Sequence, residues 1–128
     1  MPTNSIERAT VNDIVRIVTN PKRGRAVIYN GVVYLGGQTA SDKSEDIRGQ
    51  MRQALAKVDK VLGDAGTDKS RLLTAQIWIK NIARDFAGMN EVWDAWVDPE
   101  ALPTRATAQC DMAFADTLVE VMVTAARG

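Results

Sequence analysis

Two short apolar runs flank an Asn-Gly pair near the start of the chain. The runs at residues 26–29 and 32–35 are rich in β-branched and aromatic side chains, and only Asn30 and Gly31 separate them. Both positions tolerate the positive φ angles that a two-residue hairpin needs. The sequence therefore predicts a tight β-hairpin, and the rest of the chain has to build on the sheet that this hairpin begins.

Two later segments have the apolar spacing of amphipathic helices. The first follows Ser44 and runs to about Asp64, with apolar residues every three or four positions. The second runs from about residue 84 to residue 97 and stops at Asp98-Pro99. Strand-like runs at 72–79, 104–112 and 118–126 surround the second helix, and a shorter β-like run occupies residues 14–18.

These elements predict one α+β domain over residues 1–128, with the order β-β-α-β-α-β-β. Helices flanked by strands indicate a mixed sheet with both helices packed on one face. The other face carries apolar residues such as Met122, so self-association is the economical way to cover it. The alternative is a monomer in which Thr, Gln and Glu side chains keep that face hydrated.

Charge and composition exclude several classes of function. Sixteen basic and sixteen acidic residues cancel, which argues against nucleic acid or an anionic membrane as the partner. No stretch approaches the roughly 20 apolar residues of a membrane span, and the N-terminus lacks the apolar run of a signal peptide. Cys110 is the only cysteine, so no disulfide can form within the chain. We expect a cytoplasmic protein.

The sequence contains no histidine. Its absence excludes Ser-His-Asp and Cys-His catalysis, and together with the single cysteine it argues against a zinc site. Glycine-rich nucleotide-binding motifs are also missing. We therefore expect no metal and no cofactor, and chemistry carried by Arg, carboxylate, hydroxyl and backbone groups with water.

Arg105 and Glu120 are the candidate functional pair. The guanidinium offers two parallel donors to a carboxylate, and a glutamate can orient a water by accepting its proton. A hairpin between the last two strands would bring Glu120 near Arg105. Thr107 lies two residues after Arg105, so both side chains point to the same sheet face. The competing interpretation is a structural ion pair between neighbouring strands.

Five segments in this order resemble the RidA/YjgF family of enamine/imine deaminases. They are YNGVVYLGGQ at 29–38, QMRQALAKVDKVLGDAG at 50–66, DFAGMNEVWDAW at 85–96, LPTRA at 102–106 and LVEVMVTAA at 118–126. Each motif is weak alone, whereas their order and spacing are specific. The resemblance extends from about Arg25 to Ala126.

The resemblance implies a chorismate-mutase-like fold and a homotrimer with a central barrel and clefts between subunits. It implies that Arg105 holds the carboxylate of a 2-imino acid and that Glu120 positions the hydrolytic water. Gly37 would offer a backbone contact, and Asn90 would be a structural or cleft-bordering hydrogen-bonding residue. The implied activity is that of a 2-iminobutanoate/2-iminopropanoate deaminase, which releases a 2-keto acid and ammonia.

Two departures from the family pattern leave alternatives open. Thr107 stands where the family often has cysteine, although hydrolysis needs no covalent thioester and a hydroxyl can serve as a polar wall. The aromatic residue that many members place before the hairpin is replaced by Arg23 or Arg25. The alternatives are a non-catalytic module that binds a keto acid or amino acid, a deaminase or hydrolase specialised for one pathway, and an endoribonuclease.

Overall fold

A computed structural model of the chain describes residues 13–127. In chain order, the elements are β1 (Val15–Asn20), β2 (Arg23–Tyr29), β3 (Val32–Leu35), α2 (Ile47–Asp64), the short 3-10 helix η1 (Lys69–Arg71), β4 (Leu72–Ile79), α3 (Ile82–Trp96), β5 (Thr104–Gln109) and β6 (Val119–Ala126). The predicted fold class is confirmed. The structure adds β1 as a full strand, because it pairs with β2 from Val15 to Asn20 despite its short apolar run.

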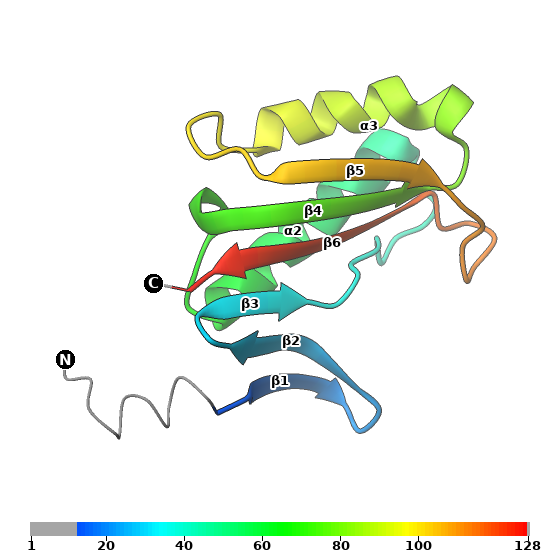
Figure 1. Cartoon of the computed structure of the whole chain (residues 1–128). Coiled ribbons are helices and arrows are strands. Elements are labelled where there is room, and N and C mark those ends of the chain that lie inside the picture. Colours follow the sequence, from blue (N-terminus) through cyan, green and yellow to red (C-terminus); the bar gives the residue numbers. More distant parts are fainter. Residues whose placement is uncertain (1–12, 128) are drawn as a thin grey trace.

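One six-stranded sheet contains all of these strands in the order β1-β2-β3-β6-β4-β5. Figure 1 shows α2 behind the strands and α3 above β5. β6, the last strand in the sequence, lies between β3 and β4 and is antiparallel to both. β4 and β5 are parallel, which requires the crossover that α3 provides. The sheet is therefore mixed, and β5 is one of its two edge strands.

The hairpin between β2 and β3 forms as the Asn-Gly pair predicts. Tyr29 pairs with Val32, and the two turn residues have positive φ angles, 51° at Asn30 and 76° at Gly31. Two successive positive φ angles are the signature of the type I′ turn, whose twist matches that of the strands it joins. A local sequence signal fixed this part of the fold.

Both helices begin at side-chain caps. The Asp46 carboxylate accepts from Gly49 N at the start of α2, and Asn81 Oδ1 accepts from Arg84 N at the start of α3. Such a cap satisfies a backbone N–H that has no partner within the helix. The helices accordingly begin at Ile47 and Ile82, within three residues of the predicted starts.

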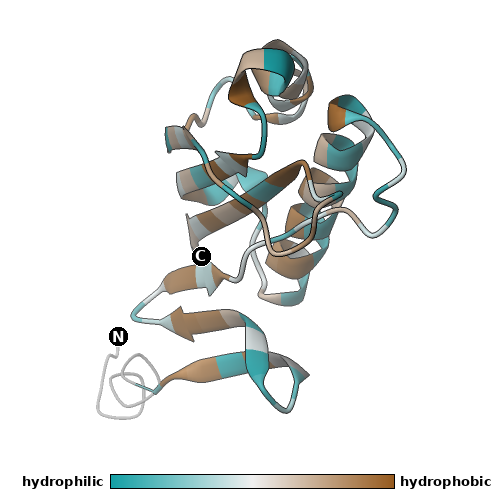
Figure 2. Cartoon of the chain, turned by 90° about the vertical axis from the view of Figure 1, so that its right-hand side faces the viewer, coloured by the Kyte–Doolittle hydropathy of each residue, from teal (hydrophilic) through white to brown (hydrophobic). Residues whose placement is uncertain are grey.

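The core lies between the helices and one sheet face. α2 packs on β3 and β6, and α3 packs on α2 and β4. Every second residue of the central strands points into this core, as in Ala75, Ile77 and Ile79 of β4. Figure 2 shows the helices gathered to one side of the strands. This face of the sheet is called the helix face below.

The opposite face, called the open face, has no helix on it. It carries the alternate residues of the strands, among them Tyr34 at 46% exposure and Met122 at 38%. Thr74 and Thr124 share a hydrogen bond of 2.6 Å across this face. The open face is thus a mixture of aromatic, thioether and hydroxyl groups. No helix within residues 13–127 combines the length and hydropathy required to cross a bilayer.

Candidate functional site

Arg105 lies in β5 on the helix face. It pairs with Ala75 of β4, whose side chain is buried under the helices. Two positions along, Thr107 pairs with Ile77, so Arg105 and Thr107 share one sheet face as the sequence predicts. The Arg105 Cζ lies 5.3 Å from the centroid of the Trp93 ring in α3. The edge strand therefore presents a guanidinium that is stacked on a helix side chain.

Trp93, Arg105 and Thr107 together are called the Arg105 group. The Thr107 Oγ1 is buried and has no hydrogen-bond partner among the described residues. Asn90 is half-buried on α3, three residues before Trp93, so it borders this group on the surface of the helix. The Arg105 group combines a planar cation, an aromatic face and an unpaired hydroxyl. Such a set is suited to an anion that also accepts or donates a hydrogen bond.

Glu120 lies in β6 on the open face. Its neighbour across the strand pair is Trp78 of β4, and its carboxylate lies against the backbone of Gly37. The segment that contains Gly37 is held there by two backbone hydrogen bonds between Gln38 and Val121, of 2.8 and 3.0 Å. Gly37, Trp78 and Glu120 are called the Glu120 group. Within this group, the Glu120 carboxylate lies against the backbone of Gly37, and Trp78 is the residue paired with Glu120 on β4.

Gly37 is required by space and not by backbone conformation. A Cβ built at position 37 would overlap the Glu120 Oε2 and would lie 2.9 Å from its Cδ. Only a residue without a side chain lets the carboxylate rest in its present position. The group that approaches Gly37 in the structure is Glu120, and the predicted backbone contact of Gly37 with a substrate stays a prediction.

The expected hairpin between the last two strands is wrong. β4 separates β5 from β6, so Arg105 pairs with Ala75 while Glu120 pairs with Trp78. The two side chains also point to opposite faces of the sheet. The physical reason is the connection at residues 110–118, which is too long for a tight turn and lets β6 enter between β3 and β4. A structural ion pair between Arg105 and Glu120 within one chain is excluded by the same arrangement.

Arg105 differs from several other arginines in its freedom to bind an anion. Arg25, Arg48 and Arg84 each form an ion pair, with Asp64, Glu91 and Asp85 respectively. The Arg84–Asp85 pair is bidentate, and the hydrogen bonds that Arg84 donates to the Asp85 carboxylate raise the pKa of Arg84. Within residues 13–127, no carboxylate oxygen lies within 4.0 Å of the Arg105 guanidinium.

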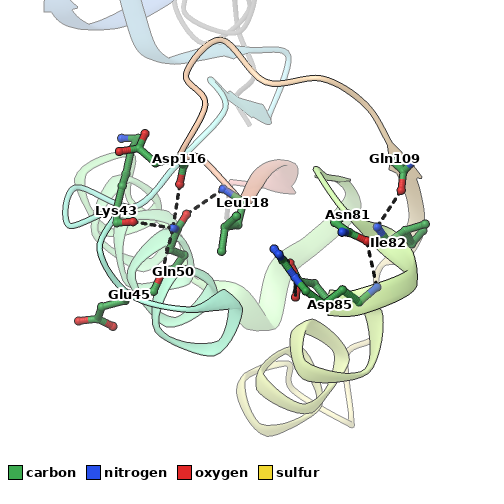
Figure 3. A network of polar contacts seen from close by, with 10 residues as sticks. Lys43, Glu45, Gln50, Asn81, Ile82, Asp85, Gln109, Asp116 and Leu118 are labelled. Atoms are coloured by element: carbon green, nitrogen blue, oxygen red, sulfur yellow. Dashed lines mark hydrogen bonds and ion pairs between the residues drawn. The ribbon is translucent and has the colours of Figure 1, made fainter.

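A buried amide fixes the loops on either side of the Glu120 group. Gln50 has no exposed surface, and its Nε2 donates to the backbone oxygens of Lys43, Glu45 and Asp116. Its Oε1 accepts from Leu118 N at 2.9 Å. Figure 3 shows this fan of contacts from α2. Because the loop at residue 118 leads directly into β6, Gln50 sets where that strand begins.

Two residues of this region were not predicted as contributors to a site. Trp93 fits the apolar stripe of α3, and nothing in the sequence shows that the cation of β5 lies over its ring. Gln50 interrupts the apolar stripe of α2 with a polar residue, and that interruption was an available signal. A second signal was the alternation of Val119, Val121 and Val123, which assigns Glu120 to the sheet face away from the buried valines.

Comparisons with known proteins agree with this fold. Residues 15–127 match the family model described as "Endoribonuclease L-PSP". A "RutC family protein" of Haemophilus ducreyi is 40% identical over 113 residues, which is 88% of this chain and 96% of that protein. The "RutC family protein YoaB" of Escherichia coli is 35% identical, over 88% of this chain and 97% of its own length.

Two solved structures have the same fold as this chain. A crystal structure of NMB1025 from Neisseria meningitidis, described as a member of the YjgF protein family, has a TM-score of 0.88 and 34% identity, covering 92% of this chain and 98% of its own. An uncharacterised protein from Pseudomonas aeruginosa has a TM-score of 0.86 and 35% identity, covering 91% and 100%. With its sheet, its two helices and nearly its whole length matched, this chain belongs to the RutC/YjgF family.

Proposed function

We propose that this protein hydrolyses 2-enamine/2-imine intermediates of amino-acid metabolism to 2-keto acids and ammonia. The reaction would take place in clefts between the subunits of a homotrimer. Membership of the RutC/YjgF family supports this reaction class. The observation that carries the proposal is the pair of separate groups, one with an unpaired guanidinium and one with a carboxylate beside open backbone.

The Arg105 group would hold the substrate. The two N–H donors of a guanidinium edge match the two oxygens of a carboxylate, which fixes both the position and the plane of a small 2-imino acid. Thr107 would contribute its hydroxyl as a polar wall two residues along β5, and Asn90 would border the cleft from α3. The imine carbon is already electrophilic, so holding the substrate in the right orientation is enough to lower the barrier to attack by water.

The Glu120 group would supply the water. The Glu120 carboxylate accepts a proton as the water oxygen bonds to C2 of the imine and passes that proton to the imine nitrogen, which gives a tetrahedral carbinolamine. The carbinolamine hydroxyl then gives its own proton through Glu120 to the nitrogen, the C–N bond breaks, and ammonia leaves while the oxygen forms the C=O bond of the 2-keto acid. Gly37 matters in this scheme because its bare backbone leaves room for the carboxylate.

A second subunit follows from the geometry of the proposal. Arg105 and Glu120 point away from each other across one sheet, so a single substrate cannot touch both within one protomer. A cleft that contains both groups takes Arg105 from one chain and Glu120 from another. Tyr34 and Met122 on the open face add apolar surface that a homotrimer would cover.

The test generates imines in place with an amino-acid oxidase acting on several amino acids. We expect wild-type protein to release keto acid and ammonia faster than the uncatalysed reaction. Arg105→Ala should lower kcat/KM about 30-fold, mainly through KM, since a charge-assisted pair is lost. Glu120→Gln should lower kcat about 100-fold because proton transfer is lost. Arg52→Ala and Glu100→Gln change the same residue types on exposed surface and serve as controls.

The competing functions give different results in the same set of assays. A binding module would take up 2-oxobutanoate through Arg105 and yet accelerate the hydrolysis of no imine. A pathway-specific enzyme would act on one imine class and leave the others at the background rate. An endoribonuclease, the activity in the description of the matching family model, would cleave RNA in a salt-dependent way. Either the first or the third result would overturn the proposal.

A further inference from the structure

We infer that Trp93 is a positioning residue that sets the plane in which Arg105 binds a carboxylate. The inference deepens the proposed function, since it rests on Arg105 as the carboxylate-binding group. It does not depend on turnover. Trp93 belongs to the buried core of the described chain and is 6% exposed, yet the Cζ of the half-exposed Arg105 lies 5.3 Å from its ring centroid.

A second indole contacts the Trp93 ring. The Trp96 ring packs against it with centroids 5.5 Å apart and planes at 48°. Trp96 is in turn anchored, because its Nε1 donates to Asp59 Oδ2 at 2.9 Å. Lys69 Nζ donates to the Trp96 carbonyl at 2.6 Å and lies 5.2 Å from the centroid of its ring. Trp93 is therefore a rigid platform between α3 and the edge strand.

A cation over an aromatic face is held without the use of any N–H donor. The attraction comes from the ring quadrupole, so the guanidinium of Arg105 keeps its donors for a ligand. An arginine side chain otherwise has many rotamers, and fixing them on binding costs free energy. By stacking Arg105 beforehand, Trp93 lowers that cost and aims the guanidinium away from the core.

Thr107 places a hydroxyl group on the same side of β5 as Arg105. Its Oγ1 is buried without a partner among the described residues, on the same sheet face as Arg105 and two residues along the strand. A ligand carboxylate that pairs edge to edge with the stacked guanidinium lies in the guanidinium plane, and Thr107 is the next residue of β5 on the same sheet face. Trp93 would thus select planar acids with a hydrogen-bonding group next to the carboxylate, as in 2-imino and 2-keto acids.

A double-mutant cycle on ligand affinity tests this role. NMR titration with 2-oxobutanoate would give the Kd of wild type, Trp93→Leu, Arg105→Ala and the double variant. We expect Trp93→Leu to weaken binding about fivefold in the wild-type background. In the Arg105→Ala background it should have no further effect, because the group it positions is absent. Trp93→Phe keeps a ring and should lie between the two.

A neutral ligand and another residue of α3 provide the controls. The affinity for 2-oxobutanamide should not change in Trp93→Leu, since an uncharged amide does not need the oriented guanidinium. Phe86→Leu removes an exposed aromatic ring from the same helix, away from Trp93 and Arg105, and should leave the Kd of 2-oxobutanoate within twofold of the wild-type value. If Trp93→Leu does not fold, the Trp93→Phe variant completes the cycle with a smaller expected loss.

The outcomes separate this inference from the proposed function. Equal loss from Trp93→Leu with and without Arg105 would show a purely structural role and overturn the inference, whatever the enzyme assay gives. Full coupling in a protein that hydrolyses no imine would support the inference while the deaminase proposal fails. No saturable binding of 2-oxobutanoate by wild-type protein would overturn the inference, while the imine assay alone decides the deaminase proposal.

Discussion

At the scale of single residues, Gly37 and Glu120 illustrate how a site can depend on a missing atom. The glutamate carboxylate occupies the space that a Cβ at position 37 would take. The clash would involve the end of a flexible side chain and no backbone atom, so the chain can fold with a larger residue there. What changes is where the carboxylate points.

We predict that Gly37→Ala lowers kcat for imine hydrolysis about tenfold with little loss of stability, because Glu120 has to swing away from its place on the backbone. Kinetics with oxidase-generated imines and thermal unfolding would measure the two effects. Gly63→Ala is the control. Gly63 lies in α2, and a Cβ at this position would meet no atom within 4 Å. It should leave kcat unchanged. A Gly37→Ala variant with normal kcat would disprove the role assigned to the Glu120 position.

At the scale of elements, the sequence predicted what local signals control. The hairpin at Asn30-Gly31, the stripe of α2 and the strand at 72–79 all correspond to the structure. Strand order was not predictable in the same way. The alternation of side chains along a strand assigns each residue to a face of the sheet, but it does not say which strand lies next to which. The supposed pairing of Arg105 with Glu120 failed for this reason.

The same limit applies to the candidate site. Residue types and the family resemblance were enough to select Arg105, Glu120, Gly37, Thr107 and Asn90. The contact between Arg105 and Trp93 joins an edge strand to a helix that precedes it in the chain, and it exists only after the crossover forms. No spacing in the sequence encodes such a contact.

Gln50 gives a prediction about how elements are joined. Gln50→Leu should lower the free energy of unfolding by about 3 kcal/mol, because several buried backbone groups of the two loops lose their partner together. Denaturant titration at matched protein concentration would measure it. Gln53→Leu removes a side chain that bonds only to the exposed backbone of Asp42, and it should cost about 1 kcal/mol or less. Equal losses in the two variants would refute the special role of Gln50.

At the scale of the whole molecule, each protomer presents its two groups back to back. The Arg105 group faces the helices at one sheet edge, and the Glu120 group faces the open side. If the proposed cleft is shared, neighbouring chains contribute different groups to it. Two impaired variants can then complement each other.

We predict that Arg105→Ala and Glu120→Gln chains, each with strongly reduced activity alone, regain activity when they assemble together. In randomly mixed cyclic trimers about one cleft in four combines an intact Arg105 with an intact Glu120, so about a quarter of wild-type activity should return. Co-expression with two affinity tags, followed by the imine assay, would measure it. Mixtures of either variant with itself serve as controls. Absence of any recovery in verified mixed trimers would contradict a shared cleft.

The back-to-back arrangement also has a consequence for how such a catalyst responds to its own abundance. In the proposed arrangement, a single subunit would contribute its Arg105 group to one cleft and its Glu120 group to another, and it would contain no complete cleft. If the proposed homotrimer dissociates directly into single chains on dilution, turnover per chain should decline with the square of the total protein concentration, because three chains would have to associate for each active trimer. A low protein concentration would then be sufficient to abolish the hydrolysis.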